Sequence, residues 1–207
     1  MVLLKKKKGR TNNFMDWLVS FGVALFVALF IISNIATVTQ VKEQSMEPTF
    51  QSDDRVVVYK LGYMISEPSR GDVVILNKNP VKKGLLVNMV NEMQEVLNSI
   101  SYRLNRDSEK NILIKRVIAI PGDRLLIKDG QVYINGEMLQ ENYTNGETHT
   151  AALGTEEVVV PEESLFVMGD NRGNSLDSRN LGFVSFSQLK GKAVYRFFPL
   201  DKAGKVQ

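Results

Sequence analysis

The sequence contains no cysteine, and this absence removes several kinds of chemistry at once. Disulfide bonds, thiol nucleophiles and thiolate metal sites are all excluded. Histidine is almost as scarce, because His149 is the only one and stands in a polar stretch. One histidine cannot form a zinc site of several histidines, and a Ser-His-Asp protease would have to use His149, whose surroundings resemble no catalytic motif. We therefore predict no metal site and no cofactor.

The sequence also has little excess charge of either sign. Its 26 Lys and Arg residues against 23 Asp and Glu residues give a formal net charge of +3, and much of the basic excess lies in residues 5–10. A nucleic-acid-binding protein usually spreads its basic residues over a wider surface. With 43% hydrophobic and 24% charged residues, the composition is that of a folded protein. We therefore predict a globular chain without a nucleic-acid partner.

The amino-terminal region combines a basic cluster with a long uncharged stretch. Four lysines and an arginine occupy residues 5–10, and Trp17–Val38 is almost wholly apolar. About 20 apolar residues span a bilayer core, whereas the apolar region of a cleavable signal peptide is usually only about 7–15 residues long. Because basic residues flank the cytoplasmic side, we predict a single-pass protein of the cell membrane. Its parts are a cytoplasmic segment (1–16), a transmembrane anchor (17–39) and an extracytoplasmic catalytic domain (40–207).

Beyond Val41 the sequence changes to short runs of β-forming residues with turn signals between them. Asp129-Gly130 between two such runs is typical of a tight hairpin. The pattern predicts a mainly β domain, built as an antiparallel folded sheet or a barrel-like sheet. The candidate strands are Arg55–Lys60, Asp72–Leu76, Ile112–Ile120, Arg124–Lys128, Gln131–Ile134, Glu157–Val160, Ser164–Met168 and Lys192–Phe198.

The region 81–111 interrupts the β pattern with a helical insertion. Between Leu85 and Leu104 the apolar residues repeat with the period of a helix and occupy one side of it, while polar residues fill the other side. An apolar stripe of this kind needs a cover. Three covers are open: the protein's own β domain, the membrane surface or a partner protein.

Three short stretches stand out as candidates for chemistry: Gln44–Thr49, Lys115–Asp123 and Gly169–Arg179. Each alone has an ordinary interpretation as a turn, a strand or a polar loop. Their order behind an amino-terminal anchor, however, closely resembles the bacterial type I signal peptidase (leader peptidase) family, in the single-anchor form of Gram-positive bacteria. The resemblance covers the anchor and nearly all of the domain after it, apart from 81–111.

The residues themselves favour a serine nucleophile with a lysine base. A serine hydroxyl needs a base, and without a competent histidine the base must be Lys, Asp or Glu. Lysine can serve only when neutral, and burial lowers its pKa from about 10.4 by up to several units. On a strand, Lys115 shares a face with apolar Leu113 and Val117, whereas Arg116 points the other way and cannot lose its proton.

The resemblance implies a role for each residue of the motifs. Ser45 would attack the scissile carbonyl, and neutral Lys115 would accept and later return the proton. The Ser45 backbone N–H would stabilise the oxyanion; the position at which some family members carry a second donor, a serine, is occupied here by Glu43. The supporting residues would be Ser175 bonded to the Lys115 amine, an Asp177–Arg179 pair, and Asp170 paired with Arg116 on the outer side of the strand.

The resemblance also implies the substrate, namely the signal peptides of exported preproteins, cleaved after small residues in an Ala-x-Ala pattern. The substrate would bind as an added strand. Alternatives are a processing protease dedicated to one substrate and a non-catalytic assembly factor for surface proteins. The sequence does not define the oligomeric state. Residues that would line apolar substrate pockets, or equally form ordinary core, are Val41, Met46, Phe50, Leu113 and Ile114.

Overall fold

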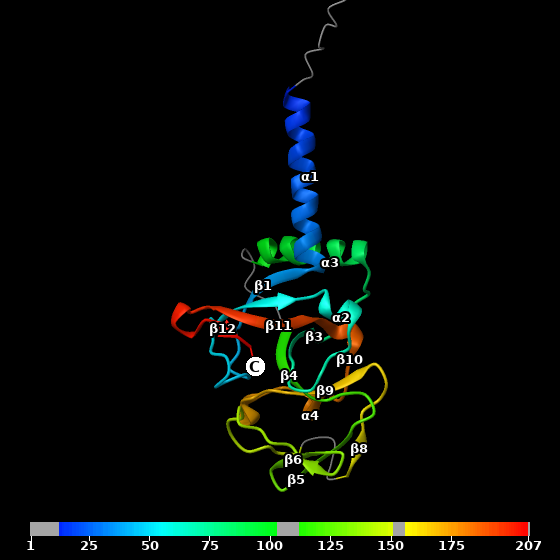
Figure 1. Ribbon diagram of the computed structural model, residues 1–207, viewed down its shortest axis with the longest axis vertical. Coiled ribbons are helices and arrows are strands. Elements are labelled where there is room, and N and C mark those ends of the chain that lie inside the picture. The colour runs from blue at the N-terminus through cyan, green and yellow to red at the C-terminus, as the bar shows by residue number, and fades with distance from the viewer. Residues whose placement is uncertain (1–12, 103–111, 151–155, 207) are drawn as a thin grey trace, which may run out of the picture.

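The computed structural model describes residues 13–102, 112–150 and 156–206. Helix α1 (Asn13–Asn34) stands away from a β-rich body, as Figure 1 shows. In the described part of the chain it is the one helix long and apolar enough to cross a membrane. It begins and ends earlier than the predicted segment 17–39, because the residues after it form strand β1 (Ala36–Gln40) instead. Thr37, Val38 and Thr39 are β-branched, and such side chains favour a strand over a helix.

The larger of two sheets has 8 strands in the order β1-β2-β11-β3-β4-β9-β10, with β12 paired to β11. All pairings between its named strands are antiparallel, which confirms the predicted mainly β, antiparallel fold. Its order has two ends, β1 and β10, so the sheet is open rather than a closed barrel. The remaining strands of this sheet are β2 (Arg55–Tyr59), β3 (Val73–Asn77), β4 (Ile112–Ala119), β9 (Ser164–Met168), β10 (Val184–Ser185), β11 (Leu189–Phe198) and β12 (Gly204–Lys205).

The smaller sheet has 4 strands in the order β7-β6-β5-β8 and lies at the end of the body away from α1 (Figure 1). Asp129 and Gly130 both have positive φ angles and join β5 to β6, so the predicted hairpin is present. Asn135 and Gly136 repeat this turn between β6 and β7. The four strands are β5 (Arg124–Lys128), β6 (Gln131–Ile134), β7 (Glu137–Met138) and β8 (Val158–Val159).

The long helix α3 (Leu85–Tyr102) crosses the base of α1 (Figure 1). It begins at the predicted residue, and the end predicted at Leu104 lies outside the described residues. Two one-turn helices and three 3₁₀ turns were not predicted, because segments this short carry no readable period. They are α2 (Gly62–Ile65), α4 (Ser178–Leu181), Arg172–Asn174, Phe186–Gln188 and Leu200–Lys202.

Strand β4 is the centre of the body. It pairs with β3 on one side and β9 on the other, and every residue from Leu113 to Ala119 is buried. Apolar clusters pack on both of its faces, one containing Ile114 and another containing Leu113 and Val117. Charged side chains in the middle of such a strand are held away from water on either face. Lys115 and Arg116 are therefore both in a buried environment.

Candidate active site

Ser45 lies in a turn that follows β1, and the backbone of the turn is held from two sides. Val41 N–H donates to Asp54 O at 2.8 Å, which ties the start of the turn to the beginning of β2. From the other side, Asn171 N–H donates to Ser45 O at 3.0 Å, and Asn171 Nδ2 donates to Gln44 O at 3.1 Å. The Ser45 side chain is therefore presented by a turn that the loop after β9 holds in place.

Lys115 meets Ser45 from the middle of β4. Its Nζ donates to Ser45 Oγ at 2.7 Å and to Ile114 O at 2.9 Å. The exposed fraction is 1% for Lys115 and 4% for Ser45, so both side chains are withdrawn from water. If the amine loses its proton, the same 2.7 Å contact lets the hydroxyl donate to the nitrogen lone pair. The pair predicted from the sequence is thus within hydrogen-bonding distance.

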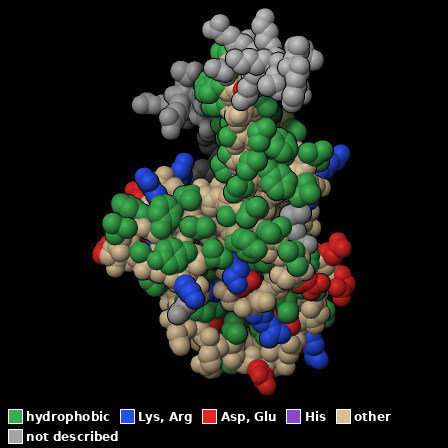
Figure 2. Space-filling view, turned by 45° about the horizontal axis from the view of Figure 1, so that its top comes forward, with side chains coloured by type: hydrophobic (Ala, Val, Ile, Leu, Met, Phe, Trp, Pro, Cys, Tyr) green, Lys and Arg blue, Asp and Glu red, His purple; other side chains and the backbone are tan. Residues whose placement is uncertain are grey.

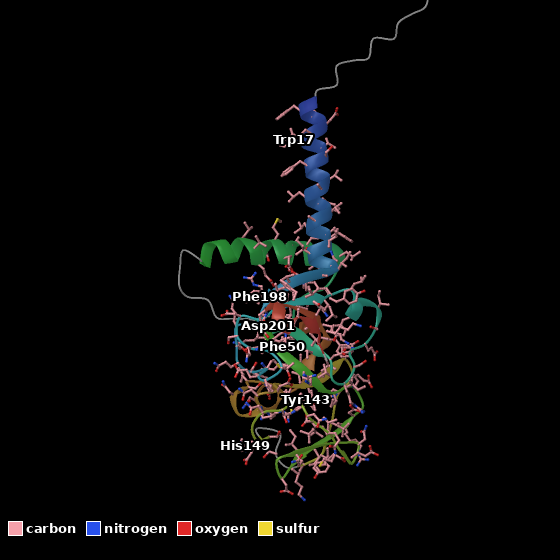
Figure 3. The ribbon with its side chains drawn as sticks, turned by 60° about the vertical axis from the view of Figure 1, so that its left-hand side comes forward. Trp17, Phe50, Tyr143, His149, Phe198 and Asp201 are labelled. Carbon is pink, nitrogen blue, oxygen red and sulfur yellow. The ribbon has the colours of Figure 1, made fainter. Side chains whose placement is uncertain are left out.

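Burial lowers the pKa of Lys115 from its ordinary value of 10.5 to about 8. The charged amine is disfavoured in the interior, and this effect exceeds the opposing attraction of Glu43, Asp177 and Asp170, which raises the pKa. A substantial fraction of the amine is therefore neutral in mildly alkaline solution. His149 offers no comparable base, since it is exposed and Figure 3 places it far below Phe50, which belongs to the Ser45 turn.

Arg116 and Asp170 form the predicted ion pair. Arg116 Nε donates to Asp170 Oδ1 at 2.9 Å and Nη2 donates to Oδ2 at 2.7 Å, in a two-pronged arrangement. Arg116 Nη1 also donates to Gly71 O at 3.0 Å, and the guanidinium stacks 4.0 Å from the centre of the Tyr143 ring. The expectation that this side of the strand faces outward is wrong, because Arg116 and Asp170 are both buried. The pair joins β4 to the loop after β9.

Asp177 and Arg179 also pair as predicted. Arg179 Nε and Nη2 donate to the two carboxylate oxygens of Asp177, each at 2.9 Å. Burial alone would raise the pKa of Asp177, but the bonds from Arg179 and from the Gly169 N–H hold that pKa below its usual value. Arg179 Nη2 further donates to Arg172 O at 2.8 Å, so the pair stabilises the loop that carries Gly169 and Asn171.

Ser175 does not make the predicted hydrogen bond to the Lys115 amine. Its Oγ is buried and makes no hydrogen bond of standard geometry within the described residues, but it acts on the nearby Asp177 carboxylate and helps to lower the pKa of that group. Ser175 instead packs against Gly169, where a Cβ atom would overlap both the Ser175 side chain and the Ser45 carbonyl oxygen. Only a glycine allows the loop to approach the nucleophile this closely.

The five residues proposed as substrate-pocket lining are all buried. Val41, Met46, Phe50 and Ile114 belong to one apolar cluster, and Leu113 belongs to another. The structure therefore favours the alternative that these side chains form ordinary core. The first cluster fixes the Ser45 turn and β4 against each other, because Met46 and Phe50 of the turn meet Ile114 of β4 in it.

The backbone N–H of Ser45 has no acceptor within the described part of the chain. It is therefore the group beside the serine hydroxyl that can donate to a developing oxyanion. Glu43, two residues earlier, is half-buried, and its charge acts on Lys115 by raising the pKa of the amine. An ionised carboxylate accepts hydrogen bonds and cannot supply a second donor.

Sequence reasoning missed two residues that hold the site together, Gly169 and Asn171. Both stand in the Gly169–Arg179 stretch, but glycine and asparagine there read as ordinary turn residues. Their contacts join segments more than 100 positions apart, so no local pattern reports them; the Asn171 Nδ2 bond to Gln44 O spans 127 positions. A third residue, Arg172, was missed as well: its Nη1 donates to Glu141 Oε2 at 2.9 Å and to Thr148 Oγ1 at 2.6 Å, 31 and 24 positions away, beyond the reach of a local pattern.

Comparison with known proteins identifies the family. The model of the family described as signal peptidase, peptidase S26, matches residues 14–198. Probable signal peptidase I-2 of Synechocystis sp. is 32% identical over 200 residues, which cover 97% of this chain and 80% of that protein. Signal peptidase I of Bacillus licheniformis is 31% identical over 210 residues, covering 97% of each chain. Signal peptidase IB of Staphylococcus aureus is 29% identical over 207 residues, covering 92% of this chain and 93% of that one.

These matches define the class of protein as a serine peptidase, a hydrolase. The chain belongs to the signal peptidase family, peptidase S26.

Proposed function

We propose that the chain is a membrane-anchored serine endopeptidase that removes amino-terminal signal peptides from exported preproteins, with Ser45 as nucleophile and Lys115 as general base. The observation that carries this proposal is the 2.7 Å contact between Ser45 Oγ and Lys115 Nζ in a buried setting that lowers the pKa of the amine to about 8. Membership of the signal peptidase family supports the choice of substrate.

In the acylation step, neutral Lys115 accepts the Ser45 proton while Oγ attacks the scissile carbonyl carbon. The Ser45 N–H stabilises the negative charge on the carbonyl oxygen. The protonated amine then donates its proton to the departing nitrogen, which releases the mature protein. Lys115 then accepts a proton from water as the water oxygen attacks the acyl carbon, and it returns that proton to Ser45 Oγ as the C–Oγ bond breaks and the signal peptide leaves.

The supporting residues act on the position of the dyad. The Arg116–Asp170 and Asp177–Arg179 pairs are buried and hold β4 and the loop after β9 in one arrangement. That loop in turn binds the backbone of the nucleophile through Asn171. Positioning matters because a displacement of about 1 Å can cost roughly 100-fold in rate.

The membrane anchor of the proposal is α1. Its side chains are mostly exposed, although most are large and apolar, and its length and composition suit a bilayer span. The basic cluster in residues 5–10, outside the described residues, supports an orientation with the amino terminus in the cytoplasm and the β domain outside. An enzyme in this position meets its substrates where they leave the membrane. The proposed cleavage specificity is for small residues before the scissile bond.

The test is cleavage of a purified preprotein by the detergent-solubilised full-length protein, followed by sequencing of the new amino terminus. The proposal expects one cut after a small residue at the end of the signal peptide, and no cut with the Ser45→Ala variant. Cleavage of only one preprotein in a panel would favour a dedicated processing protease. No cleavage of any preprotein by the folded wild-type protein would favour the non-catalytic alternative.

A further inference from the structure

The inserted helix α3 packs on the body by its polar side, which is the reverse of the usual arrangement of an amphipathic helix. Glu92 accepts from Lys60 Nζ at 2.8 Å, and Glu95 accepts from Lys190 Nζ at 2.8 and 2.6 Å. Lys60 is buried beneath the helix. The sequence left three possible covers for the apolar stripe. One of them, the protein's own β domain, therefore does not cover most of it.

The apolar side of α3 points away from the body. Leu86, Val90, Met93 and Leu97 follow an i, i+4, i+7, i+11 spacing and lie opposite Asn88, Glu92 and Glu95 at about 100° per residue. Their exposed fractions are 72%, 49%, 48% and 59% in that order. Between Leu85 and Leu97, where the side chains of this helix are described, Met89 is the apolar residue that is buried. A row of four exposed large apolar side chains is a surface that needs a cover.

The position of this row relative to α1 indicates that the membrane surface covers it. Asn34, the last residue of α1, donates to Leu85 O at 3.3 Å and accepts from Asn88 Nδ2 at 3.0 Å, so the first turn of α3 is fixed to the end of α1. Figure 3 shows α3 running crosswise to α1, with side chains projecting on the side from which α1 extends. Figure 2 shows hydrophobic side chains continuing from α1 onto the surface at its base.

The charges of α3 are also compatible with contact with a membrane surface. Acidic residues on an amphipathic helix oppose binding to an anionic membrane, which argued against a membrane contact on the sequence alone. In the structure Glu92 and Glu95 face the body and are neutralised by Lys60 and Lys190. The outward face is formed by Leu86, Val90, Met93 and Leu97, which are all uncharged.

We infer that α3 is an interfacial helix whose face of Leu86, Val90, Met93 and Leu97 inserts into the surface of the bilayer that α1 crosses. The inference rests on α1 being the membrane anchor of the proposed function. A helix fixed crosswise to a spanning helix lies along the membrane plane, which is the orientation of interfacial amphipathic helices. Ion pairs on its other face then hold the catalytic body against the membrane.

The composition of the chain makes a direct test possible. Because there is no cysteine, a Leu97→Cys variant of the full-length protein takes a polarity-sensitive fluorophore at one position. Val159→Cys is the matched control, since Val159 has the same exposed fraction of 59% but lies on β8, at the far end of the body. Trp17 is the only tryptophan and reports the embedding of α1 independently. Cleavage of a soluble peptide verifies that each variant is folded, and Leu86→Cys replaces Leu97→Cys if the latter fails this check.

The proteins are reconstituted in phosphatidylcholine–phosphatidylglycerol vesicles that carry nitroxide groups at a shallow acyl position. The inference expects a blue-shifted label at position 97, quenched several-fold more strongly than the label at position 159, together with quenching of Trp17. Quenching of Trp17 with equal behaviour of the two labels would overturn the inference and leave the anchor intact. A blue shift at position 97 without nitroxide quenching would overturn it in favour of a protein cover such as a second copy. Absence of quenching at both Trp17 and position 97 would overturn the anchor and the inference together.

Discussion

At the scale of residues, Ser45 and Lys115 form one chemical unit, and their variants test it as a unit. We expect Ser45→Ala, Lys115→Ala and the double variant to lose cleavage equally, by roughly 10³-fold or more, because neither group acts alone. Lys115→Arg is equally inactive, since a guanidinium does not lose its proton. The measurement is kcat/KM on a signal-peptide substrate. Near-normal turnover by either single variant would contradict the dyad.

The burial of Lys115 that makes it a base also reduces the stability of the fold. Below pH 8 the amine is protonated in both the folded and the unfolded chain, and the folded state bears the full cost of the buried charge. Between about pH 8 and 10.5 the unfolded chain binds more protons, so stability of the wild type rises with pH and the cost fades.

Lys115→Met keeps a similar side-chain volume and removes this cost. We expect the variant to be inactive but more stable than the wild type at pH 7, by on the order of 3 kcal/mol. The advantage should shrink as the pH rises toward 10.5. Thermal unfolding in detergent at both pH values measures it. A less stable variant at pH 7 would show that the charged amine is not a burden to the folded state.

At the scale of elements, the loop after β9 is what aligns the nucleophile, and Gly169 is its tightest point. A Cβ at this position overlaps the Ser45 carbonyl oxygen and the Ser175 side chain, so Gly169→Ala must displace both of them or move the loop itself. We expect a loss of roughly 100-fold in kcat for a displacement of about 1 Å.

Gly173→Ala in the same loop provides the control, because a Cβ there meets nothing within 4 Å. Its activity should stay within a few-fold of the wild type. Equal activity of the two alanine variants in the peptide cleavage assay would show that the close approach of Gly169 to Ser45 has no catalytic importance.

The elements also show how far the sequence alone could lead. Asp129-Gly130 and the apolar neighbours of Lys115 are local signals, and the hairpin and the buried lysine follow from them. Strand β1 was absorbed into the predicted anchor, because an apolar run does not show where a helix gives way to a strand. The period of α3 predicted its apolar side, but the ion pairs that turn this side outward involve Lys60 and Lys190, which no local pattern connects to the helix.

The same limit applied at the site. The family resemblance made it possible to predict the pairing of Arg116 with Asp170, which β4 and the loop after β9 bring together. The Ser175 bond to Lys115, expected on the same grounds, is absent; the Ser175 side chain packs against Gly169 and acts on the Asp177 carboxylate. Steric detail of this kind depends on the three-dimensional approach of two backbones, which a sequence motif does not encode.

At the scale of the whole molecule, the proposal orients the chain across a membrane. We expect protease added outside spheroplasts to digest the domain after Val41, while an epitope tag placed before Lys5 stays protected, because the basic cluster retains the amino terminus inside. Immunoblots against the tag and the domain provide the measurement. A protected domain with a digested tag would reverse the orientation.

The central claim is that a neutral, buried Lys115 activates Ser45, and the pH dependence of kcat/KM on a soluble peptide tests it most directly. Because cleavage requires the neutral amine, the rate should rise with pH along an acid limb with an apparent pKa of about 8. Glu43→Gln should move the limb to lower pH, since the charge of Glu43 raises the pKa of the amine, and His149→Ala should leave it unchanged. An acid limb near the histidine value of about 6.5 that disappears in His149→Ala would contradict the account.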